Sequence, residues 1–221
     1  MRKLLTIIFL LGLTACAPST PQLQLPQDCR AEFGAAQLLA GHWLLQNTTW
    51  RLRQTALLEI GPRKMAMEGF LQLDLTNRTA RLLALNELGL VLFDLEVTDN
   101  DEVLHRALPQ LQKIDRLAQG VGRSIRQIFL LPHPENGDQP GQQGTSQLLT
   151  RQDGIGRIDF LFDCNGDLRQ TRSDNATSNW RIIYNQYREY GMTRLPEEIV
   201  LNDYRHDIKL SLNINEVKQV P

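Results

Sequence analysis

The sequence predicts a mainly β protein of the α+β class, with about 9–11 antiparallel strands and one amphipathic helix inserted among them. Two patterns carry this prediction. Between residues 50 and 217, apolar and polar side chains alternate along several stretches, as they do in antiparallel sheets that bury one face. Residues 107–130 instead repeat apolar side chains at the i, i+3, i+4 spacing of a helix.

Residues 1–15 have the features of a cleaved secretory signal peptide. Arg2 and Lys3 supply positive charge, an apolar stretch follows, and small residues precede Cys16. The apolar stretch is too short to span a hydrocarbon core of about 30 Å as a helix. The run ending at Cys16, Leu-Thr-Ala-Cys, resembles a bacterial lipobox, which implies lipidation of Cys16 with acyl chains such as palmitate. The alternative is a secreted protein that merely has a cysteine near its cleavage site.

Lipidation would also determine where the protein resides. Several acyl chains anchor a protein stably, whereas one does so only marginally. Ala17 stands where the lipoprotein sorting rule places Asp for retention in the inner membrane, so we expect the periplasmic face of the outer membrane. The mature chain would carry a net charge of about −3 without a polybasic block, which argues against a nucleic-acid partner.

Two cysteines, Cys29 and Cys164, remain after the predicted cleavage. In an oxidising periplasm a disulfide between them is the default expectation. Closing so long a loop would stabilise the fold by up to about 5 kcal/mol. Two buried, reduced thiols are the alternative, and a metal site is disfavoured because no histidine lies near either cysteine in the sequence.

The first elements after the cleavage site are a tether and a short helix. Residues 16–28 form the predicted tether; within it, residues 17–27 hold three prolines, three glutamines and no charge. This composition favours an extended segment of roughly 30 Å. A helix is expected within residues 29–42, where several apolar side chains fall close to one face.

Residues 50–97 predict a run of strands with corners at Gly61-Pro62 and Asn77-Arg78. One face of these strands is apolar, at Leu71, Leu73, Leu75, Val91 and Phe93.

The predicted helix at 107–130 contains Gly120 and Gly122, which indicate either a kink or a close approach to another backbone. Residues 132–146 are expected to be a long, mobile polar loop. Asn165-Gly166 then predicts a tight hairpin. The clearest alternation is in the last strand, at Ile208, Leu210, Leu212 and Ile214.

Several of these stretches together resemble the LolA/LolB-type lipoprotein-carrier superfamily, and more closely its uncharacterised lipoproteins than LolB itself. The resemblance covers most of residues 45–217. The stretches that carry it are the lipobox with its tether, the meander through Leu57-Leu58-Glu59-Ile60 and Phe93-Asp94-Leu95 with its corner Asn86-Glu87-Leu88-Gly89-Leu90, and the closing Leu195-Pro196-Glu197-Glu198-Ile199 with the strand to Val217.

This resemblance implies that residues 29–221 form a single unclosed half-barrel, with the inserted helix as a lid over an apolar concave face. Members of the superfamily bind acyl chains in that hollow, and LolB-like members receive lipoproteins from a soluble carrier and insert them into the outer membrane. We therefore expect acyl-chain or lipoprotein cargo, a periplasmic carrier or envelope complex as partner, and a lid hinged at Gly120 and Gly122. The expected cavity is lined by Leu71, Leu73, Leu75, Val91, Phe93, Ile208, Leu210, Leu212 and Ile214.

Two other functions stay open at this point. If the sheet closes tightly on the helix, the same apolar residues are core, and the protein is a docking scaffold of an envelope complex without a lipid ligand. A hydrolase or lipid-modifying enzyme would need residues that only folding brings together.

The sequence does not predict catalysis, a metal site or a cofactor. His42, His105, His133 and His206 are scattered without metal-ligand spacing and are expected to be solvated. Residues 163–167 are similar to the start of a calcium loop, but the remaining ligands of such a loop are missing, and a β-hairpin turn explains the same residues without a metal. Neither Ser124 nor Ser146 lies in the G-x-S-x-G motif of a nucleophile elbow.

Overall fold

The structure is a computed structural model that describes residues 23, 33–45, 47–114, 116–153 and 156–220. The predicted signal peptide, Cys16, Cys29 and nearly all of the predicted tether lie outside these residues. The predictions made for them, including the disulfide between Cys29 and Cys164, therefore stay predictions.

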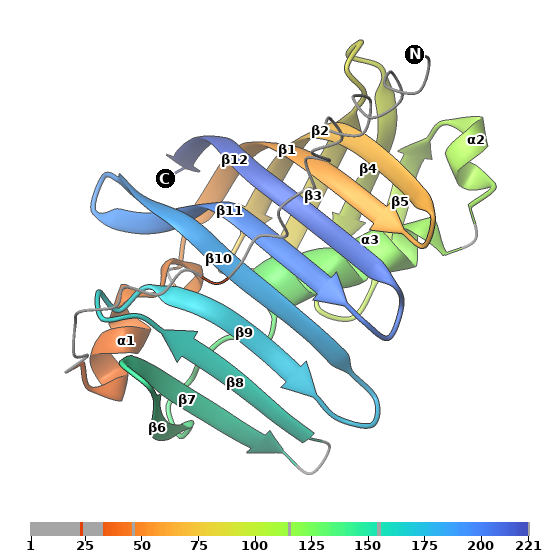
Figure 1. The fold of residues 1–221 in the computed structure, drawn as a ribbon. Helices are drawn as coiled ribbons and strands as arrows, with labels where there is room; N and C mark the ends of the chain where they lie inside the picture. Colours follow the sequence, from red (N-terminus) through yellow and green to blue (C-terminus); the bar gives the residue numbers. More distant parts are fainter. Residues whose placement is uncertain (1–22, 24–32, 46, 115, 154–155, 221) are drawn as a thin grey trace, which may run out of the picture.

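Twelve antiparallel strands form one continuous sheet that curves into an unclosed half-barrel (Figure 1). The strand order is β5-β4-β3-β2-β1-β12-β11-β10-β9-β8-β7-β6, so the first and last strands pair at the centre. The strands are β1 (Thr49–Ile60), β2 (Arg63–Asp74), β3 (Thr79–Leu85), β4 (Val91–Val97), β5 (Glu102–Ala107), β6 (Gln139–Gln143), β7 (Ser146–Asp153), β8 (Gly156–Phe162), β9 (Leu168–Asp174), β10 (Asn179–Tyr190), β11 (Thr193–Asp203) and β12 (Ile208–Val220).

The predicted fold class is confirmed, with one strand more than the largest number expected. The prediction of a long polar loop at 132–146 is wrong, because Gln139–Gln143 pairs with β7 as an edge strand. All five of its residues are exposed, so it has no buried face and no apolar alternation. Pro140 suits an edge that must not recruit another strand, because proline has no backbone N–H to donate.

In the part of the chain that the structure describes, five short helical segments accompany the sheet: α1 (Ala35–Gly41), η1 (Trp43–Leu45), α2 (Pro109–Gln112), α3 (Leu117–Ile125) and η2 (Arg126–Leu130), the last a π-helical turn. The short helix expected within 29–42 corresponds to α1. Figure 1 shows α3 running across one face of the curved sheet. Among the described residues, no helix combines the length and apolar character needed to cross a membrane.

The expectation of one helix over 107–130 is wrong in its continuity. The chain leaves the helical conformation between α2 and α3, where Arg116 has a φ of 62°. Such a left-handed backbone ends a helical run, so the predicted helix is divided into α2 and the longer α3–η2 unit.

The core lies on the inner face of the sheet, beneath α3, η2, α1 and η1. Trp43 contacts both Trp50 of β1 and Phe129 of η2 edge-on, with ring centroids 6.2 and 6.3 Å apart. All three rings are fully buried. Pairs of this geometry contribute about 0.5–1.5 kcal/mol beyond their burial, so they fix the end of η2 against the sheet.

Candidate functional site

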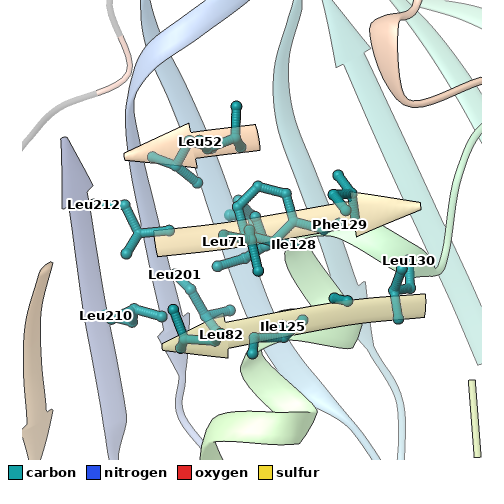
Figure 2. Close-up of a cluster of buried hydrophobic side chains, with 14 of the residues drawn as sticks. Leu52, Leu71, Leu82, Ile125, Ile128, Phe129, Leu130, Leu201, Leu210 and Leu212 are labelled. Carbon is teal, nitrogen blue, oxygen red and sulfur yellow. The ribbon is translucent and has the colours of Figure 1, made fainter. Parts of the chain in front are cut away.

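The candidate site is the space between the inner face of the sheet and the lid, by which we mean α3 and η2 (Leu117–Leu130). Ile125, Ile128 and Phe129 of the lid lie against Leu71 and Leu82 of the sheet (Figure 2). The cavity left between them is about 30 Å³, which accommodates one or two water molecules and no acyl chain. The lid is therefore in a closed position.

Most of the predicted cavity residues are buried on this inner face. Leu71, Leu73, Phe93, Ile208, Leu210, Leu212 and Ile214 are buried, and Leu75 and Val91 are half-buried. Phe93, Leu210 and Leu212 line the small cavity, with Val121, Ser124, Ile125, Ile128 and Phe129 of the lid opposite them.

One polar latch ties the lid to the turn between β4 and β5. The Arg126 guanidinium donates to the Thr98 carbonyl oxygen at 2.7 Å and forms an ion pair with Glu102. The Arg126 and Glu102 side chains are only 19% and 16% exposed, so the pair is less screened by water than a surface pair would be. The latch lies at the junction of α3 and η2.

Gly122 determines how closely the lid approaches β5. A Cβ atom placed on Gly122 would lie 3.2 Å from the Cβ atom of Glu102. A side chain there would require α3 and Glu102 to move apart by a few tenths of an ångström. Gly122 therefore lies against the Glu102 side chain. Both Gly120 and Gly122 lie within α3, and their role as a lid hinge stays a prediction.

Two polar side chains face the otherwise apolar cavity. The Ser124 hydroxyl donates to the Gly120 carbonyl oxygen at 3.0 Å within α3. Gln54 of β1 is 4% exposed, and its Oε1 atom has no hydrogen-bond partner among the described residues. The sequence contains a clue to this placement, because Gln54 occupies the inward position between Leu52 and Ala56.

His42 and His133 are close together, and the expectation that both are solvated is wrong for them. Their ring centroids are 5.8 Å apart, His42 is 5% exposed, and His133 is half-buried. Burial, together with a smaller contribution from the neighbouring His133, lowers the pKa of His42 to about 3. Burial likewise lowers the pKa of His133 to about 4, although hydrogen bonds to the backbone of Phe129 and Leu130 oppose the shift. Both rings are therefore neutral near pH 7.

The β3–β4 turn exposes an apolar tip. Asn86 shapes the turn, since its Oδ1 atom accepts hydrogen bonds from the backbone N–H groups of Leu88 and Leu90 at 3.0 and 2.9 Å. Gly89 supplies the required positive φ of 77°. Leu88 and Leu90 are 84% and 56% exposed, so water surrounds side chains that prefer an apolar phase.

No group of three or more potential metal ligands occurs in the part of the chain that the structure describes. The segment similar to a calcium loop is a turn between β8 and β9. Its Asp163 accepts hydrogen bonds from the backbone N–H groups of Asn165 and Asp167, and Asp167 forms an ion pair with Arg194. These contacts explain the acidic residues without a metal.

A similar overall fold is also found in solved structures. A LolA superfamily protein from Nitrosomonas europaea, 8% identical, has a TM-score of 0.55, with 85% of this chain and 94% of that chain covered. A putative outer membrane lipoprotein-sorting protein domain from Vibrio parahaemolyticus, 10% identical, has a TM-score of 0.50, with 84% and 90% covered. The chain shares its fold with these two structures. No protein-family model and no curated protein matches it.

Proposed function

We propose that this protein is an outer-membrane-anchored periplasmic lipoprotein that binds an acyl chain or a lipoprotein beneath its lid and helps to transfer or insert it at the outer membrane. The observation that carries the proposal is an apolar inner face on which a short lid, α3 and η2, is held to β5 by the ion pair between Arg126 and Glu102. The LolA superfamily fold supports the same role.

The energies of lid and cargo are of the same size. Five large lid side chains are buried, and each stabilises the closed state by about 1.5–3 kcal/mol; they are Leu117, Val121, Ile125, Ile128 and Phe129. A sixteen-carbon acyl chain gains about 12 kcal/mol on leaving water, at about 0.8 kcal/mol per CH₂. An acyl chain can therefore replace the contacts that the lid makes with the sheet, and the lid can expel it again without an external energy source.

The exposed tip at Leu88 and Leu90 gives the carrier a contact with the bilayer surface. Two leucines that leave water gain about 3–6 kcal/mol at most, which suffices for a transient contact while the predicted lipid on Cys16 provides the anchor. Replacing both leucines by serine should slow the transfer of cargo to vesicles but leave cargo binding unchanged.

The docking scaffold without a ligand is the second candidate, and the small cavity of about 30 Å³ favours it. The two functions differ in whether the lid opens. Every described strand and helix lies between Ala35 and Val220, so a chain of residues 17–221 retains all of them and is suitable for the test.

We would purify residues 17–221 from a periplasm, record native mass spectra, and titrate the protein with a fluorescent fatty acid. A carrier should show a bound phospholipid, acyl chain or lipopeptide, or saturable uptake of the probe. The double variant Gly122→Cys/Glu102→Cys, whose Cβ positions are adjacent, should lock the lid to β5 when oxidised and regain uptake when reduced. A clean protein mass with no uptake by the wild type contradicts the carrier and supports the scaffold.

A further inference from the structure

A second concave site lies on the outer face of the sheet, away from the lid. It is a groove of about 520 Å³, and we call it the outer groove. It crosses the central strands β12, β1, β2, β3 and β4. Its walls are formed by Arg51, Leu52, Arg53, Phe70, Leu71, Gln72, Arg81, Leu83, Asp94, Glu216, Val217 and Lys218.

The hollow shape has a cause in the strand pairing. The register shifts between β1 and β12 at Arg53/Gln54, between β3 and β4 at Ala84/Leu85, and between β4 and β5 at Asp94/Leu95. Such β-bulges bend a strand and increase its local twist, and they occur frequently beside functional sites. Two of these bulges lie at Arg53 and Asp94, which both belong to the wall of the groove, where the outer surface is concave although a half-barrel is otherwise convex.

Most charges in the outer groove are paired. Arg53 bonds to both Glu68 and Glu216. Arg81 donates two hydrogen bonds to the Asp94 carboxylate, from Nε to Oδ1 at 3.1 Å and from Nη2 to Oδ2 at 2.9 Å. The carboxylates of the groove are thus already neutralised by these two arginines.

Arg51 and Lys218 differ from these pairs. Each is exposed and has no ion-pair or hydrogen-bond partner among the side chains the structure describes. They lie directly opposite each other on β1 and β12, a position in which two like charges repel and destabilise a sheet. Two unpaired cations side by side on paired strands can bind one anion between them.

An apolar surface adjoins the two cations. Phe70 and Leu83 are opposite each other on β2 and β3, and Phe70 is 41% exposed. Phe70 pairs with Arg53, two residues along β1 from Arg51, so the apolar pair lies about 7 Å along the strands from the cationic row. The groove therefore offers a cationic end and an apolar end to one ligand.

We propose that the outer groove binds an anionic amphiphile. The anionic head, a carboxylate or a phosphate, lies between the Arg51 guanidinium and the Lys218 ammonium, and the apolar part lies on Phe70 and Leu83. Arginine binds both kinds of anion through two parallel hydrogen bonds, and lysine adds a point charge. The predicted tether segment, residues 17–27, has no charged side chain and cannot supply this anion.

The test uses residues 17–221 with dodecanoate, dodecyl phosphate and uncharged dodecyl maltoside, each below its critical micelle concentration. Inorganic phosphate is the fourth ligand. Binding is followed by isothermal titration and by amide chemical shifts. We expect dodecanoate or dodecyl phosphate to bind at least ten-fold more tightly than inorganic phosphate or the maltoside, with shifts around Arg51 and Phe70. Equal binding of the maltoside would overturn the role of the cations, and equal binding of inorganic phosphate the role of the apolar surface.

Variants assign the binding to the groove. Arg51→Gln/Lys218→Gln should weaken binding at least ten-fold, and Phe70→Ser should weaken it similarly. The matched control Arg63→Gln/Lys113→Gln removes two exposed cations outside the groove and should leave binding unchanged; an equal loss in this control would contradict a specific site.

The locked double variant Gly122→Cys/Glu102→Cys separates this proposal from the carrier function. Oxidation should abolish uptake beneath the lid but leave binding in the outer groove intact. Loss of all amphiphile binding on oxidation would place the only site beneath the lid and refute the outer groove. Retained groove binding in a protein without any lid-gated uptake would support the groove and reject the carrier.

Discussion

The two faces of the central strands differ in what fills them. On the inner face, residues such as Leu82 and Phe93 are covered by the lid, and the remaining cavity is about 30 Å³. On the outer face, residues one position away in the same strands border an uncovered groove of about 520 Å³. Because successive side chains of a strand point to opposite faces, one set of strands provides a closed apolar compartment and an open charged one.

The largest expected effect comes from truncating an inner side chain. Phe93 of β4 is 1% exposed and lines the cavity. Phe93→Ala should lower the free energy of unfolding by about 3–5 kcal/mol, because a large cavity replaces packed atoms. On the outer face, Phe70→Ala should cost less than about 1 kcal/mol, since the ring is 41% exposed. Urea denaturation of both variants measures the difference; equal losses would contradict the assignment of the two faces.

Acid should destabilise the end of the lid through His42 and His133. Both pKa values are lowered in the fold, to about 3 and about 4. The unfolded chain therefore binds protons first as the pH falls through about 6.5, and stability decreases from there until the pH reaches the folded pKa values. Arg78 and Arg151 also face His133 and oppose its protonation.

Between pH 7 and pH 5 we expect the histidine pair to account for a loss of about 2–4 kcal/mol. Urea titrations across this range measure it. His42→Gln/His133→Gln should flatten the dependence of the free energy of unfolding on pH. His105→Gln is the control, because it removes an exposed imidazole that pairs with Glu96. An unchanged slope in the double variant would show that the pair is not buried and neutral.

An intermediate effect is expected from the latch. Glu102→Gln removes the charge that Arg126 meets and should favour lid opening by about 1–3 kcal/mol. Amide hydrogen exchange in α3 and η2 should accelerate, while the central strands stay protected. Glu96→Gln, which alters an exposed pair on neighbouring β4, is the control. Uniform acceleration throughout the sheet would indicate global destabilisation and not lid opening.

The smallest effect concerns the unpaired Gln54 on the inner face. Gln54→Leu should stabilise the closed protein by about 1 kcal/mol, because it removes a buried acceptor without a partner. Gln72→Leu, at an outer position of β2, should change stability by no more than about 0.5 kcal/mol. Melting temperatures of both variants provide the comparison. A destabilised Gln54→Leu would mean that Oε1 is satisfied by bound water.

Strands that bury one face could be recognised from the sequence, and strands that bury none could not. Ile208, Leu210, Leu212 and Ile214 alternate with polar residues because the inner face of β12 is packed and its outer face is wet. The edge strand β6 is exposed at every residue. Because none of its side chains is buried, its sequence shows no alternation of apolar and polar residues. The break before α3 was missed for a related reason, since the apolar spacing continues across Arg116.

The candidate sites depended more heavily on the tertiary structure. The sequence indicated which residues face inward, but the volume left between them depends on how closely α3 approaches, and this is determined at Gly122 against Glu102. The histidine pair joins α1 to the segment after η2. No linear pattern indicates that two such distant side chains will be buried together.

The sequence by itself determined the alternation of faces and the mainly β class, because burial of one side of a strand imposes a period of two on its side chains. The tertiary structure alone decided that the first and last strands pair at the centre of the sheet. That pairing places Arg51 opposite Lys218 and forms the outer groove around them. Contacts between distant strands depend on register and bulges, which arise only when the whole sheet assembles.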